Sequence, residues 1–167
     1  KYVDAVAGTK AKILDTRKTT PDFRLFEKWA VSLGGGTNHR FGLYDMILIK
    51  DNHVDASGGI KAALQKANDY LKKSGKDLKI EIETRNLDEV KDVISAGGAD
   101  RIMLDNFSPE VMKQAIQLIN GKYETEASGG ITLENIRDYA ATGVNYISVG
   151  ALTHSYKSLD ISMKIVK

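Results

Sequence analysis

Five basic side chains stand where they could together bind a small polyanion. They follow two short apolar runs or lie in the glycine-rich loop between those runs, and they are Arg17, Lys18, His39, Arg40 and Lys50. Arginine binds carboxylates through two parallel hydrogen bonds, and lysine adds a compact positive charge. If the runs are neighbouring strands, these donors converge and suit a dicarboxylate, a phosphate or both. A single surface cation is more often solvated or paired with an acid, so the interpretation depends on Arg17, Lys18 and Lys50 acting as a set.

Two acidic residues end later apolar runs and could meet the same ligand. Glu83 ends one run and Asp105 ends the next. Two carboxylates at one edge of a sheet can hold Mg²⁺ through oxygen ligands and leave coordination positions for a substrate phosphate. They could also stabilise an oxocarbenium-like cation, and salt bridges to the basic residues are the competing interpretation. Glu126, in the following run, is a weaker candidate that fits a supporting network.

Glycine-containing loops follow the last two apolar runs and could bind a phosphate. The first loop has Ser128, Gly129 and Gly130, and the second has Gly150 and Ala151. Glycine lets the backbone approach an anion closely, and free N–H groups at a loop or helix N-terminus hold it. One Gly-Gly pair is more often an ordinary turn. Two such loops in succession favour a phosphate site, as in phosphate-binding α/β barrels.

The three histidines lack the spacing of a zinc site, and the chain has no cysteine. His39, beside Arg40, could hydrogen-bond a carboxylate, and His154 could contact a phosphate or ribose. His53 is better interpreted as a structural residue that ties down the end of a strand. No serine, histidine and aspartate stand in a context that suggests a hydrolytic triad.

An alternation of strands and helices must position these residues. Short apolar runs predict strands at 12–15, 47–50, 79–83, 101–104, 123–126 and 145–149. Apolar periodicity and capping residues predict helices over 23–33 and 59–73, after Asn86, after Ser108-Pro109, after Thr132 and over about 158–166. Such alternation predicts a parallel sheet. Six units are fewer than the eight of a complete TIM barrel, so we expect an incomplete, TIM-like parallel α/β barrel, with an open doubly wound sheet as the main alternative.

The composition indicates one globular domain over residues 1–167 and argues against several classes of partner. The net charge is only +2, from 24 Lys and Arg against 22 Asp and Glu, which gives no basis for nucleic-acid binding. No apolar stretch approaches the roughly 18 residues that a membrane span needs. The absence of cysteine fits a reducing compartment, and we expect a cytoplasmic protein. The first six residues look like the last turn of a helix, which indicates a C-terminal domain of a longer protein.

These segments, in this order, resemble the C-terminal barrel domain of the quinolinate phosphoribosyltransferase family, also called nicotinate-nucleotide pyrophosphorylase (carboxylating). The segments are Asp15-Thr16-Arg17-Lys18-Thr19-Thr20-Pro21, residues 34–40 with Gly42-Leu43, Leu48-Ile49-Lys50-Asp51-Asn52-His53, Glu81-Ile82-Glu83, Ile102-Met103-Leu104-Asp105-Asn106, Ser128-Gly129-Gly130-Ile131 and residues 147–154. They cover nearly the whole chain. The blocks around Arg17, Arg40 and Lys50 are specific, whereas Ser-Gly-Gly occurs in many phosphate-binding barrels.

The resemblance implies a type II phosphoribosyltransferase with two domains, of which this chain is the second. The implied reaction is that of a pentosyltransferase: quinolinate and 5-phosphoribosyl 1-pyrophosphate give nicotinate mononucleotide, pyrophosphate and CO₂ on the way to NAD. The implied contacts to quinolinate and pyrophosphate are Thr16, Arg17, Lys18, His39, Arg40 and Lys50, and those to the 5-phosphate and ribose are Ser128, Gly129, Gly130, Gly150, Ala151 and His154. The implied catalytic residues are Lys18, Lys50, Glu83 and Asp105, the last two also binding Mg²⁺.

The resemblance has departures and competitors. Asp22-Phe23 stands where the family more usually has Gly-Leu, and Asn145 stands where an aspartate is common. Family members also have an N-terminal α/β domain and form a homodimer or higher oligomer with shared active sites. Another phosphate-binding barrel, such as an isomerase or lyase, would not need so many cations. A non-catalytic relative, such as the molybdenum-transport-associated protein, would not need all the cations together with Glu83 and Asp105.

Overall fold

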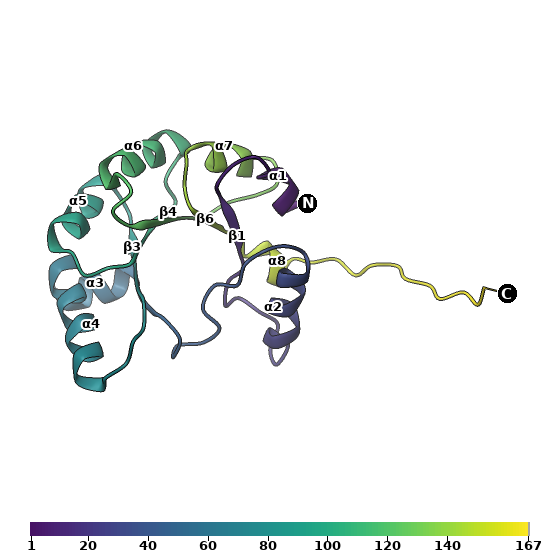
Figure 1. The fold of residues 1–167 in the computed structure, drawn as a ribbon, viewed down its shortest axis with the longest axis horizontal. Helices are drawn as coiled ribbons and strands as arrows, with labels where there is room; N and C mark the ends of the chain where they lie inside the picture. Colours follow the sequence, from purple (N-terminus) through teal and green to yellow (C-terminus); the bar gives the residue numbers. More distant parts are fainter. Residues whose placement is uncertain (167) are drawn as a thin grey trace.

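A curved sheet of six parallel strands forms the inner layer of the protein (Figure 1). The computed structural model describes residues 1–166. In that range the strands are β1 (Lys12–Leu14), β2 (Ile47–Ile49), β3 (Ile80–Thr84), β4 (Arg101–Asp105), β5 (Glu124–Ser128) and β6 (Tyr146–Ser148). Their order across the sheet is β1-β6-β5-β4-β3-β2, with every pair parallel. All six predicted strands are therefore confirmed.

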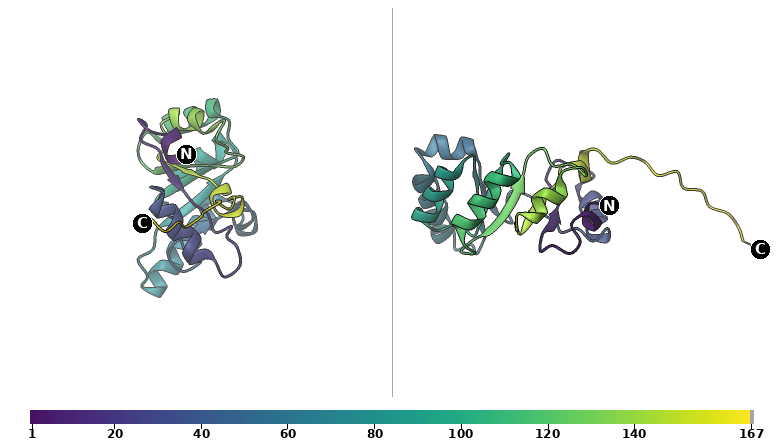
Figure 2. Two further views of the ribbon diagram at one scale, coloured as in Figure 1. Left: turned by 90° about the vertical axis from the view of Figure 1, so that its right-hand side faces the viewer. Right: turned by 90° about the horizontal axis from the view of Figure 1, so that it is seen from above.

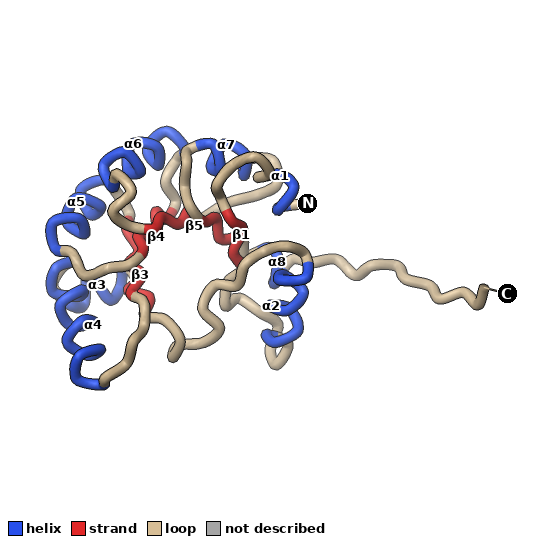
Figure 3. Tube along the Cα trace, in the orientation of Figure 1, coloured by secondary structure: helices blue, strands red, loops and turns tan. Residues whose placement is uncertain are grey.

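The helices lie outside the curve of the sheet (Figure 3). They are α1 (Tyr2–Ala5), α2 (Arg24–Leu33), α3 (Asp51–Ser57), α4 (Ile60–Ser74), α5 (Leu87–Ala96), α6 (Pro109–Ile119), α7 (Ile136–Ala141) and α8 (Ala151–His154). A doubly wound sheet would carry helices on both faces, so the incomplete barrel is the arrangement found. Asn86 and Ser108 cap α5 and α6 as predicted, each accepting a hydrogen bond from the backbone three residues on. None of the helices in residues 1–166 is both long and apolar enough to cross a bilayer.

The barrel remains open between β1 and β2, the two edge strands. A long loop after α2 runs through this opening instead of a paired strand. The loop meets β1 at Thr37, which forms an isolated parallel bridge to Leu14. The next residues, Asn38 to Arg40, are thereby placed beside the interior of the barrel.

Several helices differ from the expectations. The helix expected after Thr132 begins only at Ile136, because Asn135 first forms a turn in which its side chain accepts from the Thr132 N–H at 2.8 Å. Helix α3 was not predicted, because Asp51, Asn52 and His53 were interpreted as the end of a strand. His53 is nevertheless structural, since its Nδ1 accepts from the Lys50 N–H at 3.0 Å at the start of α3.

The helix predicted over residues 158–166 is wrong. From Tyr156 to Val166 the described chain has no helix or strand and extends away from the barrel (Figure 2). Its apolar residues alternate with polar ones, and Leu159, Ile161, Met163 and Ile165 are 81–95% exposed. A spacing of two residues puts side chains on one face of a strand, not of a helix.

Helix α2 has its polar and apolar faces reversed relative to an ordinary surface helix. The charged residues Glu27 and Lys28 are buried. Leu25, Trp29 and Leu33 are 60–72% exposed. The usual arrangement buries the apolar stripe against the core. The inner face of α2 therefore serves polar contacts, and its outer face presents apolar surface.

Candidate active site

The predicted acidic residues meet at the carboxyl ends of adjacent strands. Side chains two residues apart share a face of a strand, so Glu83 on β3 and Asp105 on β4 both project into the barrel mouth. Asp105 pairs in register with Ser128, the first residue of a predicted phosphate loop. Burial first, and then the negative charge of Asp105, raise the pKa of Glu83, whereas Lys50 lowers it. The electrostatic coupling indicates that Glu83, Asp105 and Lys50 share one region, as the sequence predicted.

The two predicted arginines interact electrostatically. Burial and then the positive charge of Arg17 lower the pKa of Arg40. Within the described residues the buried Nε of Arg17 has no hydrogen-bond partner. The Arg40 guanidinium donates to the Met46 carbonyl at 3.1 Å. Two neighbouring guanidinium groups repel each other, so this pair favours a ligand with two negative groups.

The predicted lysines are exposed at the same mouth. The backbone of Lys18 is fixed from two sides, because its N–H donates to the Thr16 hydroxyl at 3.1 Å and its carbonyl accepts from the Thr153 hydroxyl at 2.7 Å. Lys50 directly precedes α3, and its backbone N–H is held by His53. Both ammonium groups are thus free to move while their Cα positions are fixed, which suits contact with a polyphosphate.

Two of the predicted phosphate-loop glycines lie close to neighbouring side chains, and Gly129 also needs its positive φ. Gly129 has φ of 93°, and a Cβ there would collide with the Asn106 side chain. A Cβ at Gly150 would lie 2.7 Å from His154 Nε2. His154 itself is exposed, and its Nδ1 lies 2.7 Å from the Ser155 hydroxyl. The two loops therefore approach the mouth as bare backbone, with Asn106 between Asp105 and Gly129.

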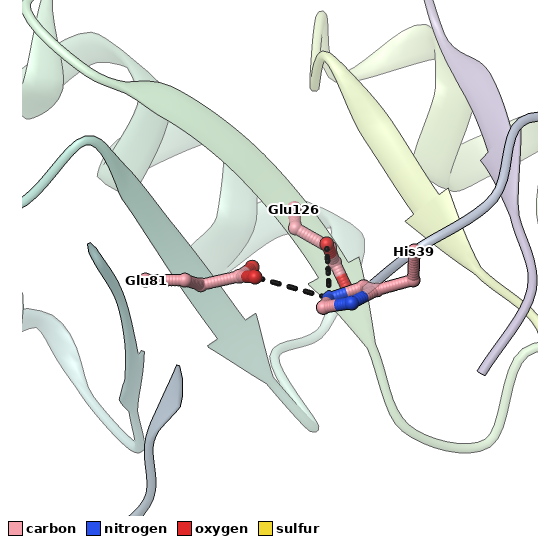
Figure 4. Close-up of side chains that lie close together, drawn as sticks. All are labelled: His39, Glu81 and Glu126. Carbon is pink, nitrogen blue, oxygen red and sulfur yellow. Dashed lines mark ion pairs between the residues drawn. The ribbon is translucent and has the colours of Figure 1, made fainter. Parts of the chain in front are cut away.

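His39 lies inside the barrel rather than exposed at its mouth (Figure 4). Its Nε2 is 3.0 Å from Glu81 Oε2 on β3 and 3.4 Å from Glu126 Oε2 on β5. Its Nδ1 accepts from the Arg40 N–H at 2.7 Å. Arg101 adds a positive charge, with Nη1 3.2 Å from Glu126 Oε2. Glu126 thus has the supporting position that the sequence suggested.

The electrostatics of this interior cluster follow from burial and mutual charge. Burial and then Glu126 raise the pKa of Glu81 to about 7. Burial lowers the pKa of His39, but the two carboxylates outweigh it and raise the value to about 9. The contacts with His39 and Arg101 lower the pKa of Glu126 despite its burial. Because Nδ1 accepts from the Arg40 N–H, the ring nitrogen that faces the two carboxylates is Nε2.

Two sets of side chains could hold a cation. The first is Glu83 with Asp105, whose oxygen donors and mutual repulsion fit Mg²⁺. The second is His39, Glu81 and Glu126, whose ligand atoms lie within 4.8 Å of one another. In the second set the Arg101 guanidinium already contacts Glu126, and a metal ion there would be repelled by it. We therefore interpret the second set as an ion-pair network.

Sequence reasoning missed Glu81, Arg101 and Asn106. Glu81 stands two residues before Glu83, so strand alternation alone places both on the interior face. Arg101 opposes Glu81 and Glu124 on the neighbouring strands, but this register becomes known only with the pairing. Asn106 has φ of 56°, and its amide donates to Asp105 Oδ2 at 2.6 Å. Its Asp-Asn sequence gave a weak indication of such a turn.

Comparison with known proteins gives concordant matches. A family model described as "Quinolinate phosphoribosyl transferase, C-terminal domain" matches residues 1–164. Nicotinate-nucleotide pyrophosphorylase (carboxylating), chloroplastic, from Arabidopsis thaliana is 50% identical over 175 residues, covering 96% of this chain and 50% of the relative. The probable nicotinate-nucleotide pyrophosphorylase (carboxylating) of Bacillus subtilis is 53% identical over 154 residues, covering 92% of this chain and 52% of the relative.

A solved structure has the same fold as this chain. The crystal structure of NadC from Streptococcus pyogenes superposes with a TM-score of 0.91 at 46% identity, covering 98% of this chain and 56% of that one. The chain thus spans about half the length of the curated relatives that it matches.

Proposed function

Since the chain belongs to the quinolinate phosphoribosyltransferase family and matches its C-terminal domain, we propose that the protein makes nicotinate mononucleotide. The substrates are quinolinate and 5-phosphoribosyl 1-pyrophosphate, and the other products are pyrophosphate and CO₂. The observation that carries the proposal is one barrel mouth that combines two guanidinium groups that interact electrostatically, Arg17 and Arg40, with two carboxylates that do the same, Glu83 and Asp105. A barrel that bound only one phosphate would need neither pair.

The basic residues orient quinolinate. Arg17 and Arg40 match its two adjacent carboxylates, and the ring nitrogen is thereby directed at the sugar. The nitrogen attacks the anomeric carbon, the bond from that carbon to oxygen breaks, and its electron pair leaves with pyrophosphate. Lys18 and Lys50, with exposed ammonium groups, stabilise the charge on that leaving group.

Loss of CO₂ follows from the first step. The ribosylated ring nitrogen is positive, so when the bond from C2 to its carboxylate breaks, the electron pair remaining on C2 is stabilised by the adjacent charge. C2 then takes up a proton. For this step the protein supplies orientation and electrostatics rather than a covalent group.

The acidic residues and the glycine loops bind the phosphoribosyl donor. Glu83 and Asp105 approach the ribose hydroxyls and would hold Mg²⁺, which when bound neutralises charge on the pyrophosphate. The 5-phosphate meets the bare backbone of the two loops, Ser128 to Gly130 and Gly150 to Ala151. His154 and Thr16 complete the contacts at the rim.

We further propose that the protein is a homodimer or higher homo-oligomer with shared active sites, and that it acts in the cytoplasm. The apolar outer face of α2 supports the first point, because monomers rarely expose so much contiguous apolar surface. An apolar cavity of about 590 Å³ adjoins that face between Phe23, Phe26, Leu152 and Tyr156. The absence of cysteine supports the second point, although several plant relatives are named chloroplastic or mitochondrial.

The test is an assay for nicotinate mononucleotide on the native protein, whose intact mass is measured on the same sample. Arg17→Ala and Lys50→Ala should each lower turnover by at least about a hundredfold while the far-UV circular dichroism stays unchanged. Glu83→Gln should raise the Mg²⁺ concentration needed for half-maximal rate. Glu110→Gln, an exposed change on α6, is the matched control. Near-normal activity of Arg17→Ala or Lys50→Ala would contradict the pocket, and an unaltered Mg²⁺ dependence would remove Glu83 from it.

A further inference from the structure

The reversed helix α2 holds, through its inner polar face, the two loops that carry the arginine pair. Its Arg24 guanidinium donates to the Arg17 carbonyl at 3.3 Å and to the Phe41 carbonyl at 3.1 Å. Glu27 accepts from the Thr20 N–H at 3.0 Å. One helix therefore contacts both the chain after β1 and the chain before β2, which also meet at the bridge between Leu14 and Thr37 and at Asp15.

A fully buried ion pair lies among these contacts. Lys28 Nζ lies 2.5 Å from Asp15 Oδ1, and the two side chains are 2% and 0% exposed. Lys28 also donates to the His39 carbonyl at 2.9 Å. Asp15 accepts from the His39 N–H at 2.8 Å and, through its second oxygen, from the Asn38 amide at 2.5 Å. The pair thus binds both backbone polar groups of His39.

This arrangement fixes Arg40 through its immediate neighbour. His39 is held on its backbone by Asp15 and Lys28 and on its ring by Glu81 and Glu126. Arg40 follows directly, and its N–H is bound by the His39 ring. The positive charge of Arg17 lowers the pKa of Arg40, so the two groups repel each other, and the contacts that hold His39 oppose that repulsion.

A buried ion pair is a poor source of stability, because desolvation offsets the attraction between the charges. Apolar residues of similar volume would fill the same space between α2 and β1 at no such cost. Besides the bond between them, Asp15 and Lys28 make three side-chain hydrogen bonds, and all three go to Asn38 and His39. The contacts therefore point to orientation of this loop rather than to general packing.

We propose that Asp15 and Lys28 are positioning residues that hold residues 38–40 so that Arg40 stays beside Arg17 in a geometry ready for two adjacent carboxylates. Both side chains are buried, so they act on the loop from inside the protein. The proposal rests on the proposed function for the identity of the ligand, but the loop geometry can be tested without it.

The first experiment measures amide hydrogen exchange in the native protein without ligand. Lys28→Met, which keeps the volume and removes the charge, should speed exchange over residues 38–41 at least tenfold and leave the central strands β4 and β5 unchanged. Lys91→Met breaks an exposed pair with Asp88 and is the matched control. Unchanged exchange over residues 38–41 in a folded Lys28→Met protein would overturn the proposal, whether or not the protein binds quinolinate.

The second experiment separates positioning from a general structural role. Binding of pyridine-2,3-dicarboxylate, measured by calorimetry, should weaken at least tenfold in Lys28→Met, whereas the KM for 5-phosphoribosyl 1-pyrophosphate should change less than about twofold. Equal losses for both ligands would contradict positioning. If the unaltered protein binds no dicarboxylate at all, the proposed function fails, and the exchange experiment alone decides the role of the ion pair.

A milder variant keeps the test valid if Lys28→Met does not fold. Asn38 is exposed, and Asn38→Ala removes the amide that donates to Asp15 and to the Lys28 carbonyl. It should shift both readouts in the same direction but by a smaller factor, about threefold. Lys28→Arg, which retains the charge, should restore dicarboxylate binding in part, and a loss equal to that of Lys28→Met would argue against the ion pair as the cause.

Discussion

The carboxylate of Glu81 lies inside the barrel, where burial and the neighbouring Glu126 disfavour its charged form. It is fully buried, and neither of its oxygens has a hydrogen-bond partner among residues 1–166. His39 and Arg101 provide positive charge nearby, but Glu126 competes for both. Such a group is more stable protonated, which is why its pKa lies well above that of a free glutamate.

Glu81 should make the stability of the fold depend on pH. Its pKa rises from 4.5 to about 7 on folding, so its stabilising contribution is complete below pH 4.5 and is lost as the pH rises toward 7. Glu81→Gln removes that loss. Thermal unfolding at pH 4.5, 5.5 and 6.5 should show the variant gaining on the unaltered protein at each step. Over this pH range the folded protein keeps His39 mostly protonated, because the pKa of His39 is about 9. A difference that stays constant with pH would contradict the raised pKa.

Gly129 should tolerate substitution less well than Gly130, although both have positive φ. A Cβ at Gly129 would meet the Asn106 side chain, whereas a Cβ at Gly130 would meet nothing within 4 Å. Gly130→Ala should cost about 1 kcal/mol from backbone strain alone, and Gly129→Ala about 2–3 kcal/mol. Urea unfolding of the two variants measures the difference. Equal costs would show that the Asn106 side chain moves aside freely.

At the scale of elements, the sequence predicted the features that depend only on neighbouring residues, namely the strands and the starts of two helices. Apolar runs identified every strand, and Asn86 and Ser108 identified the starts of α5 and α6, because side-chain alternation and capping are properties of neighbouring residues. The orientation of α2 could not be predicted in this way. Burial of Lys28 depends on Asp15, Asn38 and His39, which come together only in the folded chain. The position of His39 between β3 and β5 is likewise a tertiary property.

The extended segment after Tyr156 should contribute nothing to the stability of the barrel. Its residues are exposed, and no hydrogen bond joins residues 156–166 to the rest of the described chain. A chain ending at Lys157 should therefore unfold within about 0.5 kcal/mol of the unaltered protein in urea. A loss of more than about 1 kcal/mol would mean that the segment packs on the barrel in solution.

At the scale of the whole molecule, the largest apolar surface lies on the outer face of α2 and the segments beside it. Leu25, Trp29, Leu33, Leu43 and Tyr44 are 60–72% exposed. The adjoining cavity is lined by both ends of the barrel chain, at Tyr2 and at Leu152. This surface joins directly to the loops held by the inner face of α2, so a subunit bound there would contact the same helix that orients Arg17 and Arg40.

A charge on this surface should disrupt the proposed oligomer. Leu25→Glu with Trp29→Glu should convert a dimer to a monomer in analytical ultracentrifugation, because burying two carboxylates in an apolar interface is strongly unfavourable. The monomer should keep its circular dichroism spectrum. Leu118→Glu, on α6 and 43% exposed, is the matched control and should leave the dimer intact. A double variant that remains dimeric would place the interface elsewhere.

The pairing of β1 with β6 also has a consequence for how the chain acquires its structure during synthesis. Lys12 lies beside Tyr146, so β1 cannot pair until β6, the last of the six described strands in sequence, has been made. At a synthesis rate of roughly 5–20 residues per second, the interval is on the order of ten seconds. During that time β1 presents an unpaired edge, and β2 to β5 can already associate as neighbours in sequence. Closure of this longest loop should therefore be the late event in folding, and nascent chains stalled before residue 146 are the species in which we expect aggregation through β1.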